Sequence, residues 1–93
     1  MFSLEVREAF KNSIKEYTRI VLVEGDPDGI FKDYNLNDLK EEYIEKFYLD
    51  GLSKCKNKRT VRKIAKETVE ELLKQTIADI QRSKNAWKIN SLF

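Results

Sequence analysis

A cluster of basic residues is the part of the sequence whose residue types and spacing best suit a binding chemistry. Segment 51–66 contains no acid and seven bases, which are Lys54, Lys56, Lys58, Arg59, Arg62, Lys63 and Lys66. The preceding segment, 24–50, contains nine acids and three bases. Lysine and arginine side chains beside the free N–H groups of a helix N-terminus form a binding site for anions. We therefore take these seven bases as the candidate binding residues.

The basic segment has three competing interpretations. The acidic side chains of Glu41, Glu42 and Glu45 could neutralise it within the fold. It could instead contact the phosphates of a nucleic acid, or an acidic patch on a partner protein. The net charge of the whole chain is only +2, and no helix-turn-helix spacing is evident. Both features argue against a protein dedicated to nucleic-acid binding.

A second group of residues suits metal chemistry. The segment Val23-Glu24-Gly25-Asp26-Pro27-Asp28 resembles the first motif of Toprim domains, in which a strand ends in Glu-Gly and an aspartate follows three residues after the glycine. The resemblance covers residues 20–29 and implies an acid–base role for Glu24. A later paired-aspartate motif holds magnesium in that family, and no Asp-x-Asp follows a second buried strand here. A Toprim-like metal-dependent enzyme is therefore kept only as a further alternative.

The remaining composition narrows the classes of function. The chain has no histidine, which excludes histidine acid–base chemistry and histidine metal sites. Its single cysteine, Cys55, cannot form an internal disulfide and suits a reducing compartment. The longest aliphatic run, 20–23, is too short to cross a bilayer. We expect a cytoplasmic protein that is not an enzyme, with no cofactor, no metal site and no contact with a membrane.

Three helices are expected to position these residues. The longest runs from Thr60 to Trp87, where apolar residues recur at three- and four-residue steps without glycine or proline. The first runs from Ser3 to about Glu16. The second begins near Asn35 or Asn37 and is expected to stop at Asp50-Gly51.

The segment between the first two helices has a different period. Residues 18–24 are β-branched and almost continuously apolar, which predicts a buried strand. Residues 25–29 contain glycine, proline and aspartate and predict a turn, and residues 30–32 are expected to return as a short second strand. The predicted fold is a single α+β domain, 1–93, with three helices, the last dominant, packed around a short β-hairpin or small sheet.

The predicted core combines the apolar faces of these elements. It contains Ile64, Val69, Leu72, Leu73, Ile77 and Ile80 of the long helix, with Phe10, Ile14, Val21, Tyr43 and Phe47 against them. The apolar C-terminal residues Trp87, Ile89, Leu92 and Phe93 are expected either to dock on this body or to complete a homodimer.

The function that best fits these features is protein binding. We expect a small accessory or regulatory protein of the kind encoded by phages and mobile elements, with a protein partner. The alternative is a regulator that binds nucleic acid through the basic face at residues 54–66.

Overall fold

The computed structural model describes residues 2–87, with side chains described as far as residue 82. It consists of α1 (Leu4–Thr18), a π-helical extension η1 (Arg19–Val23), α2 (Leu36–Leu52) and α3 (Lys58–Trp87). No strand occurs in residues 2–87. The α+β prediction, with its hairpin or small sheet, is therefore wrong: the fold is all-α. None of the described helices has the length and apolar character needed to cross a membrane.

Local capping explains where α1 and α2 begin. Ser3 directly precedes α1, and its hydroxyl accepts a hydrogen bond from the N–H of Val6. Asn35 precedes α2 and forms a capping box with Asp38, in which each side chain accepts from the other residue's N–H. Such caps satisfy N–H groups that have no partner within the helix. Both helix starts agree with the sequence prediction.

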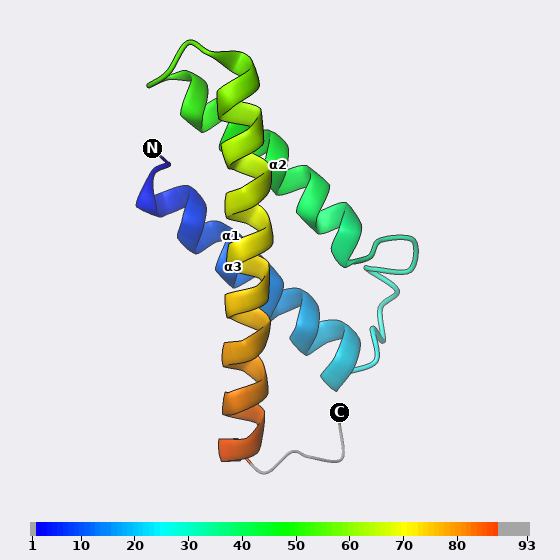
Figure 1. Ribbon diagram of the computed structural model, residues 1–93. Helices are drawn as coiled ribbons and strands as arrows, with labels where there is room; N and C mark the ends of the chain where they lie inside the picture. Colours follow the sequence, from blue (N-terminus) through cyan, green and yellow to red (C-terminus); the bar gives the residue numbers. More distant parts are fainter. Residues whose placement is uncertain (1, 88–93) are drawn as a thin grey trace.

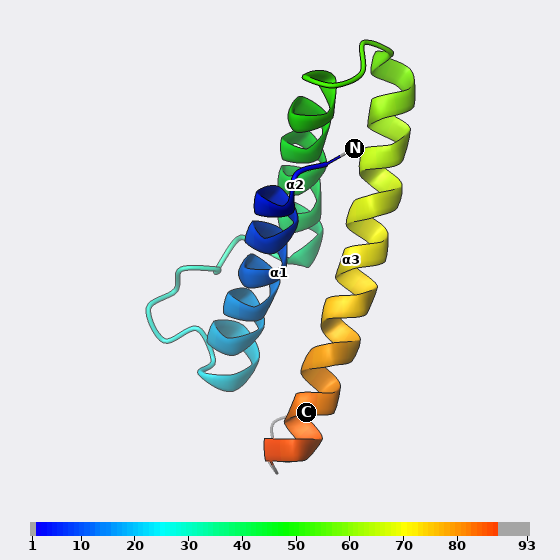
Figure 2. The same cartoon turned by 90° about the vertical axis from the view of Figure 1, so that its left-hand side faces the viewer.

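The helices form two layers. In Figure 1, α1 and α2 lie side by side and α3 runs across them, and Figure 2 shows α3 on one side of the pair. With 30 residues, α3 is about 45 Å long, and its last turns extend beyond both shorter helices in the two views. The connection between η1 and α2 lies on the side away from α3 in Figure 2.

Aromatic rings from α1, from α2 and from Phe2, which precedes α1, form the centre of the core. Phe2 and Phe47 meet edge to face with their ring centroids 5.0 Å apart, and Phe10 lies 4.8 Å from Tyr43. The hydroxyl of Tyr43, at the rim of this group, is 2.8 Å from the hydroxyl oxygen of Ser13. Buried aromatic pairs of this geometry add stabilisation beyond the apolar area that they bury.

The fully buried face of α3 is narrower than the predicted one. Its members are Val61, Ala65, Val69, Leu72 and Thr76. Val69 and Leu72 were predicted correctly, whereas Ile64, Leu73, Ile77 and Ile80 are only half-buried at its borders. Trp87, as the last residue of α3, lies beyond the described side chains, and residues 89, 92 and 93 of the predicted apolar tail lie outside the described chain.

The predicted strand at residues 18–24 is instead the end of the first helix. Thr18 is the last residue of α1, and Arg19–Val23 continue it as a π-helix, closed by a hydrogen bond from the N–H of Glu24 to the carbonyl of Arg19 at 3.0 Å. The region expected to pair with this strand, residues 30–32, forms turns. A strand without a partner leaves its backbone groups unpaired, whereas a helix satisfies them internally. The strand propensity of residues 18–24 is therefore overridden by helix formation. Val21, which was predicted to lie in the core, is only half-buried.

The end of α2 lies within two residues of the predicted stop at Asp50-Gly51, but the expectation that Gly51 itself ends the helix is wrong. Gly51 is a buried residue inside α2, which continues to Leu52. A Cβ atom at this position would lie 2.7 Å from a methyl carbon of Val61 and 2.9 Å from the ring of Phe2. The glycine therefore allows Val61 of α3 and Phe2, which precedes α1, to pack closely against α2 at this end of the core.

Candidate functional site

A short turn between α2 and α3 positions the predicted basic residues. The N–H groups of Lys54 and Cys55 both donate to the carbonyl of Gly51, which reverses the chain after α2. Asn57 then starts α3, because its side-chain oxygen accepts from the N–H of Thr60 at 3.1 Å. Its carbonyl also accepts the N–H of Val61. The turn and the cap together place the start of α3 beside the end of α2, at the top of Figure 1.

Six of the seven predicted bases are exposed at this end of the molecule. We call them the cationic end, and they are Lys54, Lys56, Lys58, Arg59, Lys63 and Lys66. The first two lie in the turn, and the others lie in the first turns of α3. Within residues 2–82, none of the six forms an ion pair.

Arg62 is separated from the other bases by its contacts with α2. Its Nη1 donates to the carboxylate of Glu45 at 2.7 Å, and its guanidinium carbon lies 4.0 Å from the centroid of the Tyr48 ring. The hydrogen bond and the charge of Glu45 raise the pKa of Arg62 above its ordinary value. Arg62 therefore contributes to the contact between the two helices.

The acids of α2 neutralise little of the basic segment, since Glu45 pairs only with Arg62 and Glu41 forms no ion pair among the described side chains. Glu42 pairs with Lys46 on the same helix at 3.5 Å, and a second ion pair between the helices joins Lys40 to Glu70 at 2.6 Å. The hydrogen bond from Lys40 lowers the pKa of Glu70. Among the described residues, internal neutralisation of the seven bases is thus limited to Arg62.

The electrostatics of the cationic end favour an external anion. The N-terminus of a helix carries a partial positive charge, so acids are favourable and bases unfavourable in its first turn. The first turn of α3 contains Lys58 and Arg59 and no acid. Lys63 and Lys66 follow Arg59 by four and seven residues, so all three lie on one side of the helix. An anion bound here would meet both the side-chain charges and the free N–H groups.

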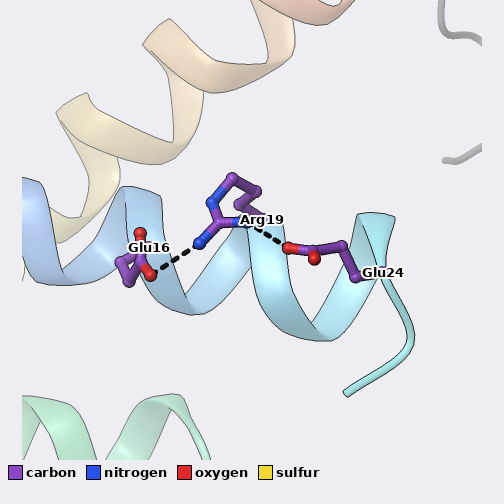
Figure 3. A network of polar contacts seen from close by, with 3 residues as sticks. All are labelled: Glu16, Arg19 and Glu24. Atoms are coloured by element: carbon purple, nitrogen blue, oxygen red, sulfur yellow. Dashed lines mark hydrogen bonds and ion pairs between the residues drawn. The ribbon is translucent and has the colours of Figure 1, made fainter. Parts of the chain in front are cut away.

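The carboxylates considered for metal chemistry do not converge. Glu24 and Glu16 both pair with Arg19, which Figure 3 shows between them. Their contact raises the pKa of Arg19, chiefly through the hydrogen bond to Glu16. Asp26 instead accepts the N–H of Phe31 at 3.0 Å. No group of three potential ligands that could hold a metal ion occurs in the described part of the chain.

The strand required by the Toprim resemblance is not formed. The residues before Glu24 are π-helical, so its side chain does not project from the end of a sheet. Gly25 has a φ of +73° and Asp26 a φ of +52°. The chain therefore leaves the helical conformation after Glu24 and forms an irregular turn. The motif therefore lacks its structural context in this chain.

Two features of the structure were not predicted from the sequence. One is the stacking of Arg62 of α3 on the ring of Tyr48 of α2. The other is a group of three aromatic side chains, Tyr17, Phe31 and Tyr34, in and beside the segment 24–35. Two aromatic residues in an otherwise polar connection are the signal that could have revealed this group.

Comparison of the chain with protein families, with curated proteins and with solved structures found no match.

Proposed function

We propose that this protein is a non-enzymatic accessory or regulatory protein that binds an acidic surface of a partner protein through the cationic end. The observation that carries the proposal is the exposure of six bases that form no ion pair within the described side chains. They surround a helix N-terminus that lacks acids. Concentrating like charges there is unfavourable for the isolated protein, and an acidic partner would relieve that repulsion.

The size of the cationic end supports a compact partner. From Lys58 to Lys66 the helix rises by about 12 Å. Glu67 follows directly, and Glu70 lies one turn beyond Lys66 on the same side of α3. A long nucleic acid that followed α3 would meet Glu67 and the ion pair of Glu70 with Lys40, whereas a small acidic patch on a protein would not.

A nucleic-acid contact is the second candidate. It is favoured by the alignment of Arg59, Lys63 and Lys66 along one side of α3, where all three are exposed. Such a row can contact consecutive phosphates and would give binding that weakens steeply with salt. Regulation through nucleic acid would then use the same residues as the protein contact.

The compartment and the assembly state belong to the same proposal. Cys55, the single cysteine, is half-buried and free, which supports a reducing compartment such as the cytoplasm. A homodimer remains part of the proposal through the apolar residues at the C-terminal end. Light scattering of the full chain and of a variant truncated after residue 87 would measure the molecular mass in solution. A mass twice that of the chain, lost on truncation, would support the homodimer.

Charge reversal tests the proposal with a matched control. The test variant carries Arg59→Glu, Lys63→Glu and Lys66→Glu, and the control carries Lys15→Glu, Lys32→Glu and Lys74→Glu, which are exposed bases outside the cationic end. Both variants change the net charge equally. Affinity capture from a nuclease-treated extract should retain the same proteins with the wild type and the control, and lose them with the test variant.

Fluorescence anisotropy with labelled duplex DNA and single-stranded RNA separates the two candidates. We expect no binding at about 50 mM salt, where phosphate contacts are strong. Binding that the test variant loses and the control retains would instead support the nucleic-acid function. If all three proteins capture the same partners and none binds nucleic acid, the cationic end has neither role.

A further inference from the structure

A cleft lies at the opposite end of α2 from the cationic end. It has a volume of about 620 Å³ and is formed by the second half of α1, the segment 24–35 and the start of α2. This volume is within the range of about 300–1,000 Å³ that is usual for ligand sites. Because α2 has 17 residues, the two ends are about 25 Å apart. The cleft is therefore independent of the proposed protein contact.

Three aromatic side chains form one wall of the cleft. The ring centroids of Tyr17 and Phe31 are 5.0 Å apart, and those of Phe31 and Tyr34 are 5.7 Å apart. Asp26 holds this arrangement in place by accepting the N–H of Phe31. The faces of aromatic rings carry partial negative charge and attract cations.

Two carboxylates from different helices complete the cleft. Glu16 of α1 and Glu42 of α2 both line it, and no lysine or arginine is among its lining residues. Arg19 and Lys46 pair with these carboxylates but do not line the cleft. Both ion pairs are about half exposed to solvent, and such pairs are weak. Each carboxylate can also accept further hydrogen bonds, because it has two oxygens with about four lone-pair sites.

We propose that this cleft binds an organic cation, an ammonium or guanidinium group carried on an aliphatic chain. The charged group of the ligand would lie between Glu16 and Glu42. The aliphatic chain of the ligand, or the flat face of a guanidinium group, would lie against the aromatic wall. Burial, together with the charges of Glu42 and Asp38, raises the pKa of Tyr34, so its hydroxyl stays protonated at neutral pH. The two carboxylates would repel an anionic ligand, and a neutral ligand would gain no charge attraction from them.

Two sources carry this chemistry, a free polyamine and a lysine or arginine side chain of a partner. Isothermal titration of the full chain with spermidine, and with the blocked peptides Ac-Ala-Lys-Ala-NH₂ and Ac-Ala-Arg-Ala-NH₂, distinguishes them. The neutral peptide Ac-Ala-Gln-Ala-NH₂ serves as the ligand control. Binding of spermidine alone identifies a polyamine site, and binding of a basic peptide identifies a site for a partner side chain. Either result supports the proposal.

The residue assignment is tested with two double variants of equal charge. Glu16→Gln/Glu42→Gln removes the carboxylates of the cleft, and Glu8→Gln/Glu41→Gln removes exposed carboxylates of the same two helices outside it. We expect the first to weaken cation binding at least tenfold, which corresponds to about 1.4 kcal/mol, and the second to leave it within about twofold. Circular dichroism of both variants is the control for folding.

The proposal is overturned by either of two results. The first is the absence of binding of all three cationic probes up to about 10 mM, beyond the millimolar range of weak specific binding. The second is equal loss of affinity in both double variants, which would indicate a general charge effect and no site. Phe31→Ala provides a further measurement, since loss of one aromatic face should weaken binding while the two carboxylates are intact.

Discussion

The guanidinium carbon of Arg62 lies 4.0 Å above the ring of Tyr48, which holds the start of α3 against the end of α2. This contact and the ion pair to Glu45 distinguish Arg62 from its neighbour Lys63, which is exposed and has no ion pair among the described side chains. Arg62→Gln should therefore lower the midpoint of thermal unfolding more than Lys63→Gln does. Circular dichroism at low and high salt measures both changes. Equal midpoints for the two variants would show that the contact does not stabilise the fold.

Thr76 is expected to limit the stability of the core. It is 1% exposed, and its hydroxyl oxygen is buried with no hydrogen-bond partner among the described residues. Thr76→Val keeps the shape and removes the unsatisfied group, so it should raise the free energy of unfolding by about 1 kcal/mol. Thr18→Val is the matched control, because the hydroxyl of Thr18 donates to the carbonyl of Ile14 at 2.8 Å. Urea unfolding should show stabilisation for Thr76→Val only.

Gly51→Ala should destabilise the protein although alanine favours helices. The new methyl group would lie 2.7 Å from a methyl carbon of Val61, and overpacking of this kind costs about 1–3 kcal/mol. That cost exceeds the gain of about 1 kcal/mol in helix propensity. Adding Val61→Ala should recover part of the loss, which a double-mutant cycle by urea unfolding would detect as coupling. Additive effects of the two substitutions would contradict the close contact.

Tyr34 should make stability depend on pH in the alkaline range. Burial, together with the charges of Glu42 and Asp38, raises the pKa of Tyr34 to about 12, compared with about 10 in an unfolded chain. The folded state therefore binds this proton more tightly, so its contribution is complete below about pH 10 and is lost as the pH rises toward 12. Tyr34→Phe should weaken this dependence. Tyrosinate absorbance should show that one of the four tyrosines titrates last in the wild type. This last titration step should be absent in the variant.

Local signals predicted the helices, because caps and apolar periodicity act over a few residues. Ser3 and Asn35 mark the starts of α1 and α2 as expected. The segment Arg19–Val23 was misassigned, since a β-branched apolar run suits a strand and a helix end equally when its partner is unknown. Gly51 was misread for a related reason. Its role depends on Val61 and Phe2, which only the folded chain brings next to it.

The candidate binding residues were predictable as a cluster but not in their individual roles. Charge counting identifies all seven bases, because they are close in sequence. The different position of Arg62 depends on Glu45, which comes 17 residues earlier and meets it only when α2 and α3 pack together. The cleft was not predictable at all, since Glu16 and Glu42 come from different helices and the wall comes from an irregular connection.

The pairing of α2 with α3 also has a kinetic consequence. These helices form the most extensive contact in the described chain, and only residues 53–57 separate them in sequence. Closing so short a connection costs little chain entropy, and domains dominated by such local contacts fold in microseconds to milliseconds. The α2–α3 hairpin is thus expected to form the folding nucleus, with α1 docking afterwards. Destabilising Val69, within that hairpin, should slow folding, whereas destabilising Phe2 should mainly accelerate unfolding.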